Sequence, residues 1–159
     1  MFDKIRNRME SEKGFTLIEL LVVILIIGIL AAIAIPSFLN QRYKGQDACA
    51  KSMAKQMQTA IKTYQTDNNS YAGATLANLS AIETSITGTT ASGNCAPVSV
   101  GLTQSGGSCS NSPDDTGFCV SAVSLSGNTF SIAESGTAGV SRRCTVGGGN
   151  NGGCNGGVW

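Results

Sequence analysis

The sequence predicts an α+β protein in which one long N-terminal helix packs on a small antiparallel β-sheet. Three observations support this: an apolar run over residues 15–35, helical periodicity in the segment that follows, and short β-rich runs between turn residues in the second half. The chain has 159 residues, which is within the range of one folded domain. We expect the helix to have a transmembrane first half and an amphipathic second half.

A polar, net basic leader precedes the apolar run. Residues 1–14 read MFDKIRNRMESEKG, and residues 15–35 follow with only Thr16, Glu19 and Gly28 interrupting their apolar character. At ~1.5 Å per residue the run spans ~31 Å, which is enough to cross the core of a bilayer. The excess of basic residues before it favours an N-terminus that faces the cytoplasm.

The helix is predicted to continue beyond Pro36. Between Asn40 and Gln65, apolar residues recur at spacings of three and four: Ala50, Met53, Ala54, Met57, Ala60, Ile61 and Tyr64. This period indicates a helix with one buried stripe. We therefore expect one helix from Phe15 to about Gln65. Pro36 should bend it or interrupt its hydrogen bonds, because proline lacks an N–H group.

The second half of the chain contains the β signals. Residues 76–86 suggest a short helix, and residues 98–102 alternate as in a short strand. Two β-rich runs within 118–132 flank Ser126-Gly127-Asn128, which predicts a hairpin. Residues 140–146 predict a further strand, and the glycine-rich end of the chain reads as loop.

Composition excludes several classes of function. The chain has no histidine, so Ser-His-Asp and Cys-His catalysis and imidazole zinc sites are absent. From Phe15 onward, seven Lys/Arg balance seven Asp/Glu, which leaves no broad basic footprint for nucleic acid. Asp114-Asp115 offers too few oxygen ligands for calcium, and Arg142-Arg143 reads as a solvated strand face. We expect no enzymatic activity, no cofactor and no metal.

Six cysteines follow the apolar run: Cys49, Cys95, Cys109, Cys119, Cys144 and Cys154. An even number in a small exported domain indicates disulfides formed in an oxidising compartment. The C-x2-C spacing usual for an all-cysteine metal site is missing. We prefer Cys144–Cys154 as one pair, because it would close a glycine-rich loop, and the other four cysteines admit three pairings.

The segment Gly14-Phe15-Thr16-Leu17-Ile18-Glu19-Leu20 carries a family resemblance. An ordinary signal peptide has a shorter apolar core and then a small-residue cleavage site, whereas this run is long and contains a carboxylate. It resembles the class III signal of type IV pilins and pseudopilins. The resemblance implies cleavage after Gly14 by a prepilin peptidase, N-methylation of Phe15 and retention of the apolar segment. Gly28 and Pro36 also fall where pilins often carry these residues.

The resemblance implies an organisation and a function. Residues 1–14 would be a cleaved cytoplasmic leader, residues 15–39 the transmembrane and polymerisation segment, and residues 40–159 an extracellular globular pilin domain. The chain would be a structural subunit of a type IV pilus-like fibre that serves adhesion, twitching motility or DNA uptake. Its partners would be further copies of itself in a helical filament, the peptidase, an assembly platform and its ATPase. It would be a single-pass membrane protein before assembly and part of a cell-surface fibre afterwards.

Glu19 is the candidate assembly residue. An ionisable side chain within a membrane span is costly and is a functional candidate by default. Cleavage after Gly14 would place a positive amine on Phe15, four residues away. We expect Glu19 to pair with the Phe15 amine of a neighbouring subunit, while Gly28 also fits a plain packing residue.

Three alternatives remain at this stage. The first is a pseudopilin of a type II secretion system, which the sequence barely separates from a pilin. The second is a soluble secreted domain cleaved after Ala34, since Ala32-Ile33-Ala34 matches an A-x-A site. Glu19 and the length of the apolar run count against it. The third is a signal-anchored surface protein that never polymerises.

Overall fold

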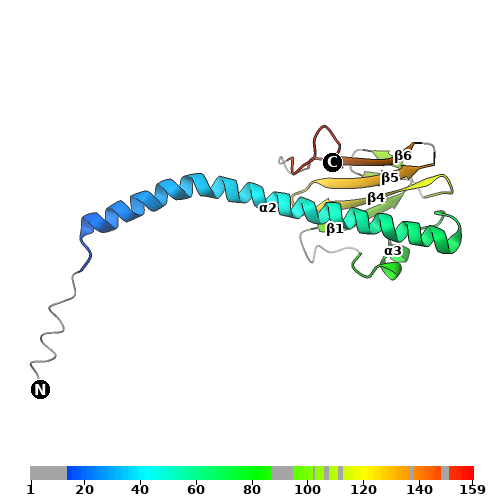
Figure 1. Cartoon of the computed structure of the whole chain (residues 1–159), viewed down its shortest axis with the longest axis horizontal. Coiled ribbons are helices and arrows are strands. Elements are labelled where there is room, and N and C mark those ends of the chain that lie inside the picture. Colours follow the sequence, from blue (N-terminus) through cyan, green and yellow to red (C-terminus); the bar gives the residue numbers. More distant parts are fainter. Residues whose placement is uncertain are drawn as a thin grey trace, which may run out of the picture. The chain divides into compact units, whose positions relative to one another are not determined.

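The structure is a computed structural model that describes residues 14–86, 95–101, 103–105, 108–110, 113–136, 138–147 and 151–159. Within these ranges the helices are α2 (Leu17–Asn68) and α3 (Leu76–Ile82). The strands are β1 (Cys95–Gly101), β2 (Thr103–Ser105), β3 (Ser108–Ser110), β4 (Gly117–Ser124), β5 (Thr129–Ser135) and β6 (Gly139–Thr145), and Figure 1 shows their arrangement. Residues 1–13 of the expected leader, Leu102 and residues 148–150 lie outside the described residues.

The long helix α2 contributes to both units into which the chain divides, Met1–Leu39 and Asn40–Trp159. It starts two residues later than expected and ends three residues later. Its end coincides with Asn69, whose φ of 55° lies in the left-handed region that asparagine tolerates better than most residues. The predicted fold class, a long helix packed on a small antiparallel sheet, is confirmed.

The main sheet lies entirely in the second unit. Its four strands are ordered β1-β4-β5-β6, and each neighbouring pair is antiparallel. The β4–β5 hairpin turns through the predicted Ser126-Gly127-Asn128 segment, where Gly127 has a φ of 90°. The Ser124 N–H closes this turn by donating to the Asn128 carbonyl oxygen at 2.7 Å. The strands expected around residues 98–102 and 140–146 correspond to β1 and β6.

The amphipathic half of α2 packs on one face of this sheet (Figure 1). The helix buries the small residues Ala50, Ala54 and Ala60 together with Met57 and Ile61. The sheet contributes the buried side chains of Phe118, Val120, Ala122, Phe130 and Ile132. Burying a large apolar side chain contributes about 1.5–3 kcal/mol, so this stripe holds the helix on the sheet.

The short sheet β2–β3 was not predicted from the sequence. The disulfide Cys109–Cys119 ties β3 to β4. Cys119 alternates along β4 with Phe118 and Val120, so its side chain points to the face opposite α2. Ser121 and Ser131 are also fully buried although they too alternate with core residues. The second face of the main sheet is therefore partly covered.

The other two disulfides tie the long helix and the C-terminal tail to the sheet. Cys49–Cys95 joins α2 to β1, and Cys144–Cys154 joins β6 to the tail. Cys144–Cys154 is the pair preferred from the sequence. Cys49–Cys95, together with Cys109–Cys119, is one of the three pairings that the sequence left open for the other four cysteines.

The predicted short helix is α3. Thr75 caps its N-terminus in a reciprocal capping box with Asn78. Leu79 is fully buried, and Ile86, expected to share the helical pattern, is buried beyond the helix end.

Candidate functional site

The candidate assembly segment begins where α2 begins. Thr16 precedes the helix, and both its side-chain hydroxyl and its backbone carbonyl accept hydrogen bonds from the Glu19 N–H, at 3.2 and 3.1 Å. This is the N-cap arrangement, and it fixes the first turn. Glu19 therefore lies in the first turn of α2, where the helix dipole favours a negative charge.

Apolar side chains cover the whole circumference of this segment. An 18-residue window within α2 has a mean hydropathy of 3.1, and none of it is buried within the structure. Phe15 is 84% exposed and Ile33 is 72% exposed. A helix that is apolar all round belongs in lipid or among other helices. Among the described residues, α2 is the one helix long and apolar enough to cross a membrane.

Gly28 opens a shallow groove on one side of this helix. The groove is lined by residues that recur on one helical face: Leu21, Ile24, Leu25, Gly28, Ile29 and Ala32. A Cβ atom added at Gly28 would meet nothing within 4 Å. The described part of this subunit therefore does not require glycine there. Gly28 and Ala32 form a small-xxx-small pair, a spacing that lets another helix approach closely.

Pro36 lies inside α2, which is continuous through Gly28 and Pro36 in this single chain. Proline lacks the N–H that would bond to the Ala32 carbonyl, so the helix is locally weaker there. The expectation that this stretch bends or unwinds concerns the assembled fibre, and it stays a prediction.

The C-terminal tail of the second unit is organised around Lys51. The ammonium group of Lys51 donates to the carbonyl oxygens of Gly152 and Gly153, at 3.4 and 3.2 Å. It also lies 4.9 Å from the ring centroid of Phe130 and 5.8 Å from that of Trp159. A cation over an aromatic face is favourable, so Lys51 joins α2 to both the tail and the sheet.

A buried carboxylate stands one turn before Lys51. Asp47 is fully buried and accepts hydrogen bonds from the Ser126 hydroxyl and, at 2.9 Å, from the Asn128 side-chain amide. The Asn128 side-chain oxygen accepts from the Gly147 N–H at 3.1 Å. A Cβ at Gly152 would lie only 1.3 Å from an Asp47 carboxylate oxygen, so the tail passes very close to this cluster.

The paired carboxylates Asp114 and Asp115 both accept hydrogen bonds within the second unit. Thr116 donates both its backbone N–H and its hydroxyl to Asp114, at 2.7 and 2.5 Å. These bonds, the hydroxyl first, lower the pKa of the Asp114 carboxyl. Asp115 accepts from the Ser70 hydroxyl just beyond α2. Both carboxylates thus act as acceptors within this end of the second unit.

The apolar segment matches a known family. A family model described as the prokaryotic N-terminal methylation motif matches residues 9–35. The chain is 48% identical over 63 residues to the type IV wide pilus major component of Thermus thermophilus, a match covering 40% of this chain and 48% of that protein. It is 56% identical over 52 residues to the type IV major fimbrial protein FimA of Dichelobacter nodosus, covering 33% of each. Over its N-terminal segment, the chain is therefore similar to type IV pilins and fimbrial proteins.

The chain is also similar to proteins of type II secretion systems. The chain is 37% identical over 60 residues to the type II secretion system core protein G of Pectobacterium carotovorum subsp. carotovorum, covering 38% of each chain. All three relatives are thus matched over less than half of their own length. No solved structure gives a significant match.

The matched pilin motif contains some of the predicted site residues and not others. Gly14, Phe15, Glu19 and Gly28 lie within residues 9–35, whereas Pro36 and all six cysteines lie outside this range. Sequence reasoning missed two features of the site. The T-x-x-E spacing of Thr16 and Glu19 is a capping signal that was available. The roles of Asp47 and Lys51 depend on contacts with residues far along the chain.

Proposed function

We propose that the chain is a structural subunit of a type IV pilus-like fibre. It polymerises through its apolar N-terminal helix after a prepilin peptidase cuts between Gly14 and Phe15. The observation that carries the proposal is the exposed apolar surface of α2 before Asn40, of which no part of the most apolar window is buried in the described chain. Such a surface needs lipid or other helices around it.

Assembly exchanges one apolar environment for another. Each exposed leucine or isoleucine would cost about 1.5–3 kcal/mol in water relative to a buried site. The bilayer satisfies this surface before assembly, and the helices of neighbouring subunits satisfy it in the fibre core. Close packing then supplies attraction that lipid does not, and the groove at Gly28 and Ala32 gives a neighbouring helix room to approach.

Glu19 supplies the register between subunits in this proposal. Cleavage leaves a positive amine on Phe15 beside the start of an apolar helix. A charge buried without a partner costs several kcal/mol, and an opposite charge offsets much of that cost. Every subunit brings one amine and one carboxylate, so staggered copies pair the Phe15 amine of one with the Glu19 carboxylate of the next.

The partners and location follow from the same proposal. The chain waits in the membrane with its N-terminus in the cytoplasm, and the peptidase cleaves it and methylates Phe15. An assembly platform driven by a separate ATPase lifts it into a cell-surface fibre used for adhesion, twitching motility or DNA uptake. The chain itself contributes no catalytic residue. The pilus descriptions of the Thermus and Dichelobacter relatives support this reading.

The test of assembly uses Glu19→Ala produced in cells that also make the wild-type chain. The variant should enter the membrane and fold its second unit, yet be strongly depleted from sheared fibres, as measured by mass spectrometry of both fractions. Glu83→Ala, an exposed carboxylate in the second unit, is the matched control and should be incorporated normally. Equal incorporation of the two variants would refute the role of Glu19.

Processing is tested separately. The mature chain should begin at Phe15 and carry a methyl group, and Gly14→Val should accumulate as the uncut precursor. A mature chain beginning at Ile35 would instead establish a soluble secreted domain.

A pseudopilin of a type II secretion system is the second candidate, favoured by the similarity to core protein G. Such a subunit would also assemble through α2. Deleting the secretion system of the source cell separates the two: long surface fibres that contain this chain should persist if it is a pilin.

A further inference from the structure

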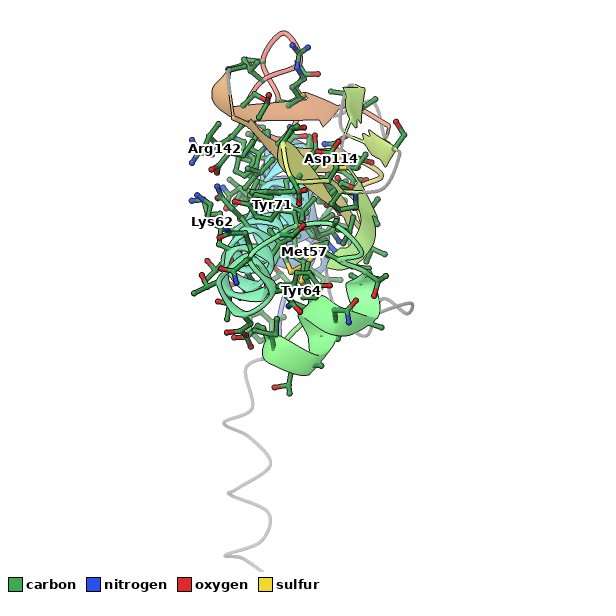
Figure 2. All side chains as sticks on the ribbon, turned by 90° about the vertical axis from the view of Figure 1, so that its right-hand side faces the viewer. Met57, Lys62, Tyr64, Tyr71, Asp114 and Arg142 are labelled. Carbon is green, nitrogen blue, oxygen red and sulfur yellow. A yellow bond between two sulfur atoms is a disulfide. The ribbon has the colours of Figure 1, made fainter. Side chains whose placement is uncertain are left out.

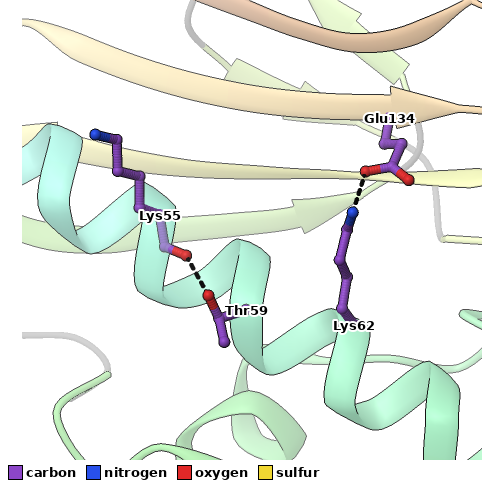
Figure 3. Close-up of polar contacts among 4 residues, drawn as sticks. All are labelled: Lys55, Thr59, Lys62 and Glu134. Atoms are coloured by element: carbon purple, nitrogen blue, oxygen red, sulfur yellow. Dashed lines mark hydrogen bonds and ion pairs between the residues drawn. The ribbon is translucent and has the colours of Figure 1, made fainter.

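Four lysines form a straight stripe along one side of α2 in the second unit. Lys44, Lys51, Lys55 and Lys62 follow one another at intervals of seven, four and seven residues. At about 100° per residue, these positions fall within about 40° of one line, and at ~1.5 Å per residue they cover ~27 Å of helix. Figure 3 shows Lys55 and Lys62 leaving α2 on the same side.

Two of these lysines have partners within the subunit and two do not. Lys51 binds the tail, and the Lys62 ammonium lies 2.7 Å from a Glu134 carboxylate oxygen (Figure 3). Lys44 and Lys55 are exposed, and their ammonium groups make no hydrogen bond or ion pair with any of the residues that the structure describes. The ammonium groups of Lys44 and Lys55 are therefore available to bind a group outside the described part of this subunit.

Arg142 on β6 extends the stripe. Its guanidinium carbon lies 5.9 Å from the centroid of the Trp159 ring, the same ring that Lys51 approaches. We call the surface formed by Lys44, Lys51, Lys55, Lys62 and Arg142 the basic face.

Carboxylates lie on another side of the same unit. Figure 2 shows Lys62 and Arg142 together on one side of the second unit and Asp114 on the opposite side. Asp115 lies beside the end of α2 through its bond from Ser70, and Asp67 occupies the last turn of that helix. No basic residue stands in this last turn, although the helix dipole favours a cation there. We call Asp67, Asp114 and Asp115 the acidic end.

The second unit contains nearly equal numbers of basic and acidic residues. Residues 40–159 contain seven basic and six acidic residues, so their formal charges nearly cancel. Five of the basic residues form the basic face, and three of the acidic residues form the acidic end. A surface adapted to a polyanion alone would not need the acidic end. Two complementary surfaces on different sides of one molecule form a heterologous contact, which repeats from copy to copy and generates a filament or a ring.

We propose that the basic face of one copy docks on the acidic end of the next copy in the fibre. The inference rests on the proposed function, because the apolar helices must first bring the second units together. Exposed ion pairs add little affinity, so the contact chiefly selects orientation and neighbour. It thereby fixes how the outer units are placed around the fibre, a task separate from the pairing at Glu19.

The test is zero-length carbodiimide cross-linking of sheared fibres, which joins a lysine amine to a carboxylate that contacts it. Gel separation of monomers from covalent dimers, followed by mass spectrometry, identifies the linked residues. We expect links from Lys44 or Lys55 to the acidic end in dimers and not in monomers. Their yield should fall severalfold at about 1 M salt, where the Debye length is about 3 Å.

Lys62–Glu134 is the internal control, since this pair lies within one subunit and should be linked in monomers. If that control link forms while dimers carry no link from the lysine stripe to the acidic end, the proposal is overturned. Retention of added DNA by the fibres through Lys44 and Lys55, without such links, would also overturn it and assign the stripe to a polyanion. If no fibre contains the chain, both this proposal and the proposed function fail. In the two outcomes above, fibres form and only the docking proposal fails.

Charge exchange provides the second measurement. Lys55→Glu should lower the yield of these dimers severalfold, and so should Asp115→Lys. The double variant should restore it, because the opposite charges face each other again. Glu83→Ala, an exposed carboxylate outside both surfaces, is the control and should leave the yield of these dimers unchanged. The Lys62–Glu134 link reports in every variant that the second unit is folded. Failure of the double variant to recover would contradict the docking of these two surfaces.

Discussion

Replacing Asp47 with alanine should destabilise the second unit although the residue touches no ligand. Asp47 lies on α2, and its carboxylate accepts from side chains 79 and 81 positions away, at the turn between β4 and β5. The substitution removes this connection between helix and sheet. Asp67→Ala is the matched control, since Asp67 stands on the same helix but is exposed.

The expected loss in the free energy of unfolding depends on the hydrogen-bond donors that lose Asp47 as their acceptor. The Ser126 hydroxyl also contacts the Ser124 hydroxyl oxygen at 2.9 Å, so it keeps a partner without Asp47. Asn128 is fully buried, and one N–H of its side-chain amide loses its acceptor. Leaving a buried donor unsatisfied costs about 1–3 kcal/mol, and removing a buried charge recovers part of its desolvation cost. We therefore expect a loss of about 2 kcal/mol in the free energy of unfolding, against less than about 0.5 kcal/mol for Asp67→Ala.

The fluorescence of Trp159 measures this loss directly. It is the only tryptophan in the chain, its indole N–H donates to the Ser131 carbonyl oxygen at 3.3 Å, and its ring packs edge-on against Phe130. Urea titration of the oxidised chain in detergent micelles gives the midpoint and slope for each variant. Equal midpoints for Asp47→Ala and Asp67→Ala would refute the reasoning. Asp47→Asn retains an acceptor oxygen and should fall between the wild type and Asp47→Ala.

Three further predictions use the same unit. Cys144→Ser and Cys109→Ser should each lower the free energy of unfolding by about 2–3 kcal/mol in urea titrations with the freed thiol blocked, because both disulfides join cysteines separated by 10 positions. Lys62→Ala should cost less than about 1 kcal/mol, because its ion pair with Glu134 is partly exposed, with side chains 47% and 26% exposed, and the difference should shrink at about 1 M salt. Thr116→Val should raise the pKa of Asp114 towards its usual value in an NMR titration. The lowered pKa in the folded state stabilises the wild type above the unfolded pKa, and that contribution is lost as the pH falls through the folded pKa, so the variant should show a smaller change there.

The helices and the main hairpin could be predicted because their signals are local. The period of Ala50, Ala54 and Met57 indicated which face of α2 is buried, and Ser126-Gly127-Asn128 indicated the turn. The ends of α2 were displaced by two or three residues, since they depend on Thr16 as a cap and on the left-handed Asn69. Such details require the backbone angles themselves.

The strands β2 and β3 could not be predicted because their residues carry little apolar alternation. Thr103–Ser105 and Ser108–Ser110 consist of polar residues and one cysteine. What attaches them is a tertiary bond, Cys109–Cys119, whose pairing depends on where β3 lies against β4. The same dependence left Cys49–Cys95 open, because it requires the register of β1 on β4. Only Cys144–Cys154 had a local argument, the need to hold a glycine-rich loop.

The buried carboxylate of Asp47 could be predicted in part from the sequence. Extending the helical period of Ala50 and Ala54 back by one turn reaches Gln46 and Asp47, so the sequence already places two polar residues on the buried stripe. A polar residue on a buried stripe requires partners, and the Ser126-Gly127-Asn128 turn contains side chains able to donate to a carboxylate. Their meeting depends on the position of the turn above that part of α2, which only the packing of helix on sheet determines. The periodicity therefore identifies where a polar cluster must exist, while the tertiary structure identifies which residues complete it.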